Sequence, residues 1–127
     1  GGSCGMVAIK KMTTTAIGKI WTGVTIAHPG LLRLAELFVK KTSWRGPFEL
    51  ECIESGGELY VIEVNPRFPA WVYFSTAAGI NLPERLINLV TKGKCDRSCD
   101  YKAGRLFVRY TYEIVTGLEE YSRLALQ

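Results

Sequence analysis

The feature that most constrains the fold is a pair of β-rich runs on either side of two glycines. The runs are Phe48–Ile53 and Leu59–Asn65, and Gly56 and Gly57 lie between them. Apolar residues at every second position are typical of strands with one buried face, and glycines supply the left-handed backbone that a tight turn needs. The stretch therefore predicts an antiparallel β-hairpin with a three-residue loop, Gly56–Glu58.

The register of this hairpin brings acidic side chains together. The apolar sets that must face the core together are Phe48, Leu50 and Cys52 on the first strand and Tyr60, Ile62 and Val64 on the second. With a three-residue loop, this requirement pairs Glu51 with Glu63 and Glu49 with Asn65, because a slip of one residue would turn every side chain to the other face. Three carboxylates and one amide are therefore expected to converge.

Such a cluster needs a compensating positive charge. Two carboxylates about 5 Å apart, at an effective dielectric constant of about 20, repel each other by about 3 kcal/mol. The compensation is either a lysine or arginine, or a divalent cation bound by two carboxylates and a neutral amide. Arg67 fits a phosphate beside such a cation, and it fits an ion pair with Glu63 equally well. Of the adjacent Lys10 and Lys11, at most one can point toward the site.

The rest of the chain predicts antiparallel strands and interspersed helices. The expected strands are a hairpin of 6–13 with 19–27 and a strand at 106–115. The expected helices are one after Pro29, one at 72–78 ended by Gly79, one at 82–91 and the start of a last helix. In the helix at 82–91, Leu86, Leu89 and Val90 are expected to point inward. His28 is expected to cap a helix or to be solvated. The pattern indicates an α+β fold, an antiparallel sheet of hairpins with helices packed on one face. We expect residues 1–127 to form a single domain, because this length buries one core.

Composition narrows the class of protein. With 47% hydrophobic and 22% charged residues, the chain is an ordinary globular sequence. It has no apolar run of about 20 residues and no signal sequence, so we expect a cytoplasmic protein without a membrane segment. The net charge of +4 is scattered along the chain, which argues against nucleic acid as a partner. The chain begins Gly1-Gly2-Ser3 without methionine, and we expect it to be a piece of a longer protein.

The cysteines give little sign of a structural role. Cys95 and Cys99 have a C-x3-C spacing with no second pair and no neighbouring histidine, so a zinc site lacks ligands. Cys4 and Cys52 lie far from them in the sequence. We therefore expect four reduced, unligated thiols.

One motif resembles a known family. Glu63-Val64-Asn65-Pro66-Arg67 at the end of a strand is similar to the Glu-x-Asn-Pro-Arg motif of the ATP-grasp ligases. The segment 46–51, the two-glycine hairpin and the segment 78–83 follow in the family's order. The resemblance is closest to the carbamoyl-phosphate-synthetase-like branch and covers most of the chain. In that branch the first magnesium ligand stands twelve residues before the motif glutamate, as Glu51 does before Glu63.

The resemblance implies a site and a reaction. Glu51, Glu63 and Asn65 would bind Mg²⁺ or Mn²⁺, with ATP as co-substrate, and Arg67 would be catalytic, contacting the terminal phosphate of ATP or the acyl phosphate. In this family a carboxylate attacks the γ-phosphate, and an amine or thiol captures the resulting acyl phosphate. The chain would be the C-terminal lobe of the ATP-grasp domain. We expect it to be inactive alone, because the N-terminal parts that complete the sites for ATP and the carboxylate substrate are not in residues 1–127.

A second function remains open from the sequence. The aromatic segment Phe68–Phe74 departs from the family, whose members usually carry small or basic residues shortly after the motif arginine. A non-catalytic interaction domain with the same fold would use this segment to bind a partner protein. The sequence leaves the oligomeric state and the identity of the acid and amine open.

Overall fold

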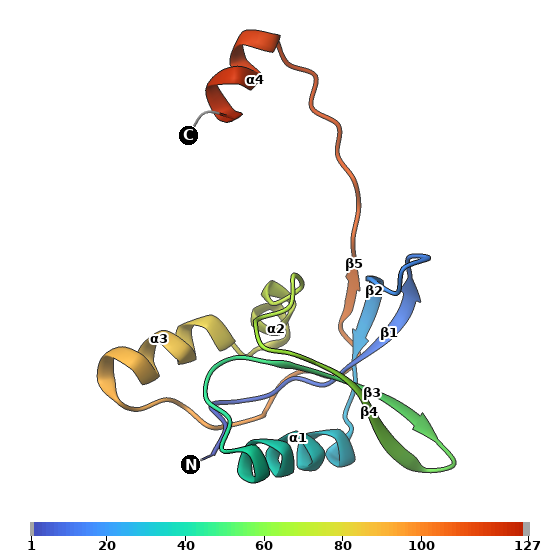
Figure 1. Ribbon diagram of the computed structural model, residues 1–127, viewed down its shortest axis with the longest axis vertical. Helices are drawn as coiled ribbons and strands as arrows, with labels where there is room; N and C mark the ends of the chain where they lie inside the picture. Colours follow the sequence, from blue (N-terminus) through green and yellow to red (C-terminus); the bar gives the residue numbers. More distant parts are fainter. Residues whose placement is uncertain (1, 126–127) are drawn as a thin grey trace.

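The computed structural model describes residues 2–125, and in these residues the fold is α+β (Figure 1). The elements in chain order are β1 (Ile9–Thr14), β2 (Ile20–Thr25), α1 (Pro29–Thr42), β3 (Glu49–Ser55), β4 (Glu58–Asn65), α2 (Tyr73–Ala78), α3 (Leu82–Lys92), β5 (Leu106–Val108) and α4 (Leu118–Ala125). The expected α+β class is confirmed. The two hairpins do not share a sheet, however, because β1, β2 and β5 form one antiparallel sheet and β3 and β4 form another.

The three-stranded sheet is held together at a buried threonine of β2. The Thr25 hydroxyl donates to the carbonyl of Lys102 at 2.7 Å and accepts from the backbone N–H of Arg105 at 2.9 Å. These bonds fix the turn before β5 against the end of β2, so that β5 enters the sheet antiparallel to β2. On the same sheet, the ring of Phe107 lies 5.6 Å from that of the buried Phe74, which attaches α2.

Strand β5 is much shorter than the expected strand at 106–115. Its last bond to β2 runs from the N–H of Arg109 to the carbonyl of Trp21 at 2.9 Å, and β2 itself begins at Ile20. The expectation was wrong because the partner strand ends here, although the β-type sequence continues. Beyond Arg109 the chain leaves the sheet as an extended arm that carries α4 away from the body (Figure 1).

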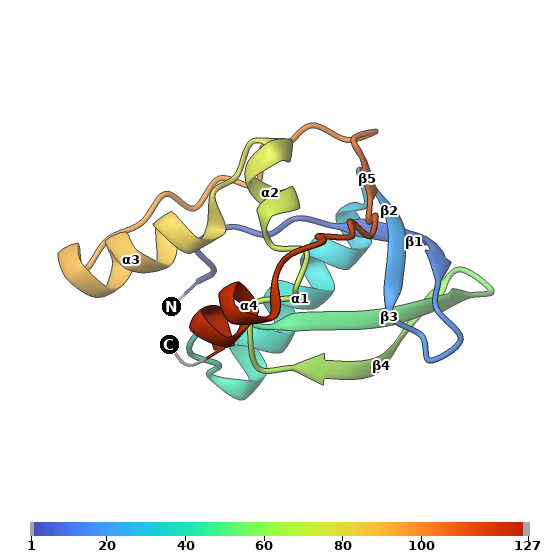
Figure 2. The ribbon, with the colours of Figure 1, turned by 90° about the horizontal axis from the view of Figure 1, so that it is seen from above.

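Helix α1 lies on one side of the β3–β4 hairpin (Figure 1) and crosses it obliquely (Figure 2). It begins at His28, whose Nδ1 accepts a hydrogen bond from the N–H of Leu31 at 3.1 Å, so the histidine is a cap as expected. At the other end of the helix, the rings of Phe38, Trp44 and Phe48 lie 5.2 to 5.8 Å apart. This cluster anchors α1 to the start of β3, where the acidic residues begin.

Helix α3 does not bury its apolar face as expected. Leu89 and Val90 are exposed, and Leu86 is only half-buried. All three line an open cavity of about 1550 Å³ that apolar residues of α1 and β3 also line. The expected inward orientation was wrong because the apolar face of α3 opens into this cavity. None of the helices within residues 2–125 is long and apolar enough to cross a membrane.

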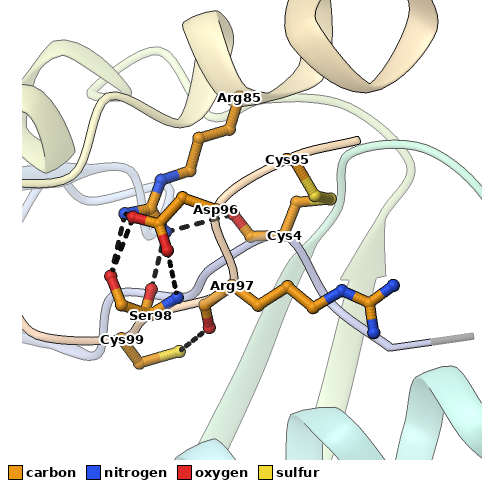
Figure 3. Close-up of a disulfide and its surroundings, with 7 residues drawn as sticks. All are labelled: Cys4, Arg85, Cys95, Asp96, Arg97, Ser98 and Cys99. Carbon is orange, nitrogen blue, oxygen red and sulfur yellow. Dashed lines mark hydrogen bonds and ion pairs between the residues drawn. A yellow bond between two sulfur atoms is a disulfide. The ribbon is translucent and has the colours of Figure 1, made fainter. Parts of the chain in front are cut away.

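A disulfide ties the N-terminal segment to the loop after α3 (Figure 3). Cys4 and Cys95 are bonded, with 5.8 Å between their Cα atoms. Beside them, the Arg85 guanidinium donates to the carbonyl of Cys4 at 3.3 Å and pairs with Asp96 at 2.6 Å. The expectation of four free thiols was therefore wrong, and Cys52 and Cys99 are the free cysteines among the described residues. A contact between residues 91 positions apart leaves no pattern in the sequence.

The disulfide should contribute strongly to stability. Cross-linking residues 91 positions apart lowers the entropy of the unfolded chain, worth at most about 5 kcal/mol in the chain-entropy model. We expect Cys4→Ser with Cys95→Ser to lower the melting temperature by roughly 10 °C or more. Calorimetry measures the shift, and Cys99→Ser is the matched control. An unchanged melting temperature in the double variant, or four reactive thiols in the native wild type, would contradict the bond.

Candidate acidic site

The β3–β4 hairpin has the expected pairs at the acidic residues. Glu51 lies opposite Glu63, and Glu49 lies opposite Asn65. Residues directly opposite each other in an antiparallel pair project to the same face, with Cβ atoms about 5 Å apart. The structure therefore confirms this part of the predicted register, with the two glutamates side by side and Asn65 at the end of its strand.

The route to this register differs from the expected one. The loop consists of Gly56 and Gly57 alone, with φ angles of 59° and 83°, as in the tight turns that join twisted hairpin strands. From the turn as far as the pair of Cys52 with Val61 the strands keep the register of this two-residue loop, and the register then shifts between Glu51 and Cys52. Ile62 is the extra residue of a β-bulge. The predicted three-residue loop was wrong, and the bulge supplies the one-residue shift instead.

The bulge also changes which side chains reach the core. Tyr60 and Ile62 were expected to share the buried face with Val64, but both are exposed. Tyr60 pairs with Ile53, which is exposed as well. Val64, on the other side of the bulge, pairs with Leu50, and both are half-buried. The expectation for Tyr60 and Ile62 was wrong because a continuous alternation was assumed across the bulge.

Glu49 is the best-connected residue of the site. Its Oε1 accepts a hydrogen bond from the indole N–H of Trp71 at 3.0 Å, and its Oε2 lies 3.5 Å from Nδ2 of Asn65 and 3.7 Å from Arg67. Only 12% of its side chain is exposed. Removal from water, reinforced by the negative charge of Glu51, raises the pKa of Glu49 above its ordinary value, although the bond from Trp71 opposes this.

Glu51 is paired with a lysine from the other sheet. Nζ of Lys11, on β1, lies 2.5 Å from Oε2 of Glu51. Lys10, the next residue along the strand, is exposed. This agrees with the expectation that at most one of these two lysines points toward the site, and that lysine is Lys11. Glu63 is exposed to solvent, so the site combines one lysine-paired carboxylate with one in contact with water.

Arg67 extends from the end of β4 into solvent. Its side chain is 59% exposed, and its guanidinium donates to Oδ1 of Asn65 at 3.4 Å and to the carbonyl of Phe68 at 3.3 Å. Its carboxylate neighbour is Glu49. The ion pair with Glu63 that the sequence left open is thus made with Glu49 instead. At 3.7 Å and with this exposure, the attraction is weak and leaves the guanidinium accessible.

The donor atoms suit a hard divalent cation. Glu51, Glu63 and Asn65 offer carboxylate and amide oxygens, which Mg²⁺ and Mn²⁺ prefer over nitrogen or sulfur. Their present partners, Lys11 and Arg67, are flexible side chains that a cation can replace. Within residues 2–125, no group of three or more His, Cys, Asp and Glu side chains is placed to hold a metal ion. The expected ligand set is not a group of this kind, because it consists of two carboxylates and the side-chain amide of Asn65.

Two of the acidic residues, Glu49 and Glu51, lie at one side of the large cavity, whereas Glu63, Asn65 and Arg67 do not line it. Lys11, Glu49, Glu51 and Trp71 all line it, and its other lining residues are mainly apolar. A mostly apolar recess with a few converging charged groups is typical of small-molecule sites. The volume of about 1550 Å³ exceeds that of one small ligand.

Sequence reasoning missed the part played by Trp71. In the sequence the tryptophan was only part of the aromatic segment Phe68–Phe74, and its hydrogen bond to Glu49 joins residues 22 positions apart. Nothing in the local sequence indicates that contact. The position of Glu49 near the site was expected from the sequence, but the burial of its side chain was not expected.

No protein-family model matches the chain, and no curated protein matches it.

The raised pKa of Glu49 predicts a pH-dependent stability. A carboxyl group whose pKa is raised by folding stabilises the fold fully below its ordinary pKa of 4.5, and this stabilisation is lost as the pH rises through the folded-state value. Glu49→Gln keeps an acceptor for Trp71 without the charge. We expect the variant to melt at the same or a higher temperature than wild type at pH 7, with the difference closing below pH 4.5.

Thermal unfolding between pH 4 and 7 measures this difference. Glu58→Gln, at the exposed start of β4, is the matched control and should follow wild type throughout. A Glu49→Gln variant that is much less stable than wild type at pH 7 would show that the carboxylate stabilises the fold in its charged form.

Proposed function

We propose that this chain is the ATP- and Mg²⁺-binding C-terminal lobe of an ATP-grasp ligase of the carbamoyl-phosphate-synthetase-like branch. Glu51, Glu63 and Asn65 are the proposed ligands of Mg²⁺ or Mn²⁺, and Arg67 is the proposed catalytic residue. The intact enzyme would join a carboxylate to an amine or a thiol through an acyl phosphate. Residues 1–127 alone would be inactive, because in an enzyme of this family further parts would complete the sites for ATP and the acid.

The observation that carries the proposal is the pairing of Glu51 with Glu63. Opposed carboxylates destabilise a sheet, and of these two glutamates only Glu51 has a lysine partner within residues 2–125. A bulge at Ile62 is what brings the two glutamates to the same face, and bulges often re-aim side chains beside active sites. An arrangement that costs stability and needs an irregular strand is more typical of a functional site than of a structural one.

The accessible arginine supports the same proposal. Phosphoryl transfer depends on positioning and on stabilising the charge that spreads over the phosphate oxygens. Arg67 presents a forked guanidinium to solvent next to the oxygen donors, with weak contacts that a phosphate can outcompete. A bound magnesium ion would supply further positive charge there. The indole of Trp71 keeps Glu49 in place beneath Arg67 and Asn65, so these two side chains start from a defined position.

The interaction-domain alternative has less support. It relies on the aromatic segment Phe68–Phe74 as a free surface, but Phe74 is buried against Phe107 and Trp71 is engaged by Glu49. Tyr73 is the strongly exposed aromatic residue of the segment. Most of the segment therefore serves the fold and the acidic site, which leaves little aromatic surface for a partner.

We also propose that the protein is cytoplasmic, because the proposed enzyme uses ATP. Disulfides are rare in reducing compartments, and there the Cys4–Cys95 bond would be open to reduction. Counting the free thiols of protein isolated from cells under acid quench determines which form is present.

Cation binding to this chain is the direct test. Mn²⁺ should broaden the amide NMR signals around Glu51, Glu63 and Asn65. The cation should bind weakly, because the phosphates that would complete the site are absent. ATP alone should also bind poorly. Glu63→Gln should abolish the broadening. Lys11→Met should strengthen it, because Lys11 competes with the cation for Glu51, whereas Lys10→Met should not. Broadening spread evenly over the acidic residues of the surface would contradict the site.

Turnover by the intact gene product tests the reaction. Glu63→Gln should leave the melting temperature in EDTA within a few degrees of wild type, because Glu63 is exposed and faces a like charge. ATP turnover with a panel of carboxylic acids should fall at least about 100-fold, because an anionic ligand of the metal is lost. Glu58→Gln is again the control. Normal turnover in Glu63→Gln, or no turnover by wild type with any acid, would contradict the ligase proposal.

A further inference from the structure

The arm that follows β5 has an exposed apolar stripe. Between Arg109 and the start of α4, the chain is extended and projects from the body (Figure 1). Within residues 2–125, the backbone groups of residues 110–115 have no hydrogen-bond partner. Tyr110, Tyr112 and Ile114 have 81%, 78% and 78% of their surface exposed. An extended segment of this composition, with free backbone groups, is a template for pairing with another strand.

The arm continues an edge strand. In the sheet order β1-β2-β5, strand β5 has β2 on one side and no strand of the described residues on the other. The N–H of Arg109 points to β2, where it donates to Trp21. Because backbone groups alternate in direction along a strand, those of Val108, Tyr110 and Tyr112 point to the open edge. The same edge that β5 leaves free therefore continues along the arm.

The sequence of the arm is complementary to itself in an antiparallel register. When two copies are centred on Thr111, Arg109 of each copy faces Glu113 of the other, and Tyr110 faces Tyr112. Thr111 then faces its own counterpart. Opposite charges, aromatic pairs and threonine pairs are the cross-strand combinations that stabilise sheets. Shifting either strand by two residues would break the charge pairing, so the charges select one register.

Arg109 and Glu113 are available to pair with the same residues of a second copy. Within residues 2–125, Glu113 has no ion-pair partner, and it is exposed. The guanidinium of Arg109 lies over the ring of Phe107, 5.8 Å from its centroid, which holds it on the face of the strand that Glu113 also occupies. In the centred register this stacked arginine meets the carboxylate of the second copy.

We propose that the arm pairs with the arm of a second copy of this chain, forming a two-fold symmetric dimer. The two three-stranded sheets would join through their β5 strands and arms into one continuous antiparallel sheet. The face of the joined strands would carry Leu106, Val108, Tyr110, Tyr112 and Ile114 from each copy. Such an interface is self-complementary, as a two-fold axis requires. This surface is separate from the acidic site, and the proposal does not depend on the ligase function.

Charge exchange tests the register. Sedimentation equilibrium should show a dimer for wild type. Glu113→Arg and Arg109→Glu should each raise the dimer dissociation constant by roughly tenfold or more, because each puts two like-charge pairs across the axis. The double variant R109E/E113R restores opposite charges and should dimerise within about threefold of wild type. Glu119→Arg, on α4 outside the paired segment, is the control.

Cross-linking tests the geometry independently. Thr111 would face its counterpart at a position between hydrogen-bonded pairs, where Cα atoms lie about 4.5 Å apart, within the range of a disulfide. In a chain with Cys52→Ser and Cys99→Ser, Thr111→Cys should form covalent dimers on mild oxidation, and Ser122→Cys on α4 should not. A monomeric wild type at about 100 µM, well above the micromolar range of ordinary specific association, would overturn the proposal. A dimer unaffected by the single charge changes would also overturn it, since it would use another surface.

Discussion

The bulge at Ile62 is the constraint on which the acidic site depends. If the register set by the Gly56–Gly57 turn continued along β3 and β4, Glu51 would face Ile62, and Glu63 would face Leu50. The two glutamates would then lie on opposite faces of the hairpin. One extra residue in β4 removes this mismatch. The cost is two exposed apolar side chains near the turn, Tyr60 and Ile62. The hairpin therefore gives up part of its core surface to bring carboxylates together.

The three carboxylates have distinct environments because the hairpin is placed between different neighbours. Glu49 is held by Trp71 and is mostly out of water, so its carboxyl group favours the neutral form more than a free glutamate does. Glu51 meets a lysine, and Glu63 meets solvent. Glu49 thus contacts the amide of Asn65 and the guanidinium of Arg67, and under the proposed function the other two glutamates supply the oxygen donors. These differences follow from burial and from the neighbours of each carboxylate, and they do not require different residue types.

The sequence predicted the pairing of the acidic residues better than it predicted the packing around them. The predicted three-residue loop with unbroken alternation placed Glu51 opposite Glu63, and the structure reaches the same pair through a two-residue turn and a bulge. The two-residue turn and the bulge were missed together, since their effects on the register cancel at the acidic residues. The Cys4–Cys95 bond and the Trp71–Glu49 bond were missed because the tertiary fold alone brings those residues together. The length of the strand that begins at Leu106 was overestimated, because the β propensity of a segment does not indicate where its partner strand ends.

The ion pair between Lys11 and Glu51 connects the acidic hairpin to the three-stranded sheet. Lys11 lies on β1 and Glu51 on β3, so the pair is an electrostatic link between the two sheets. Under the proposed function, a cation bound by Glu51 competes with Lys11 for the same oxygen. Binding would therefore release the lysine from the hairpin and leave its ammonium group free at the edge of the cavity, where an anionic ligand is its natural new partner. The same lysine that stabilises the acidic pair would in this way become available to hold a phosphate once the cation has taken its place.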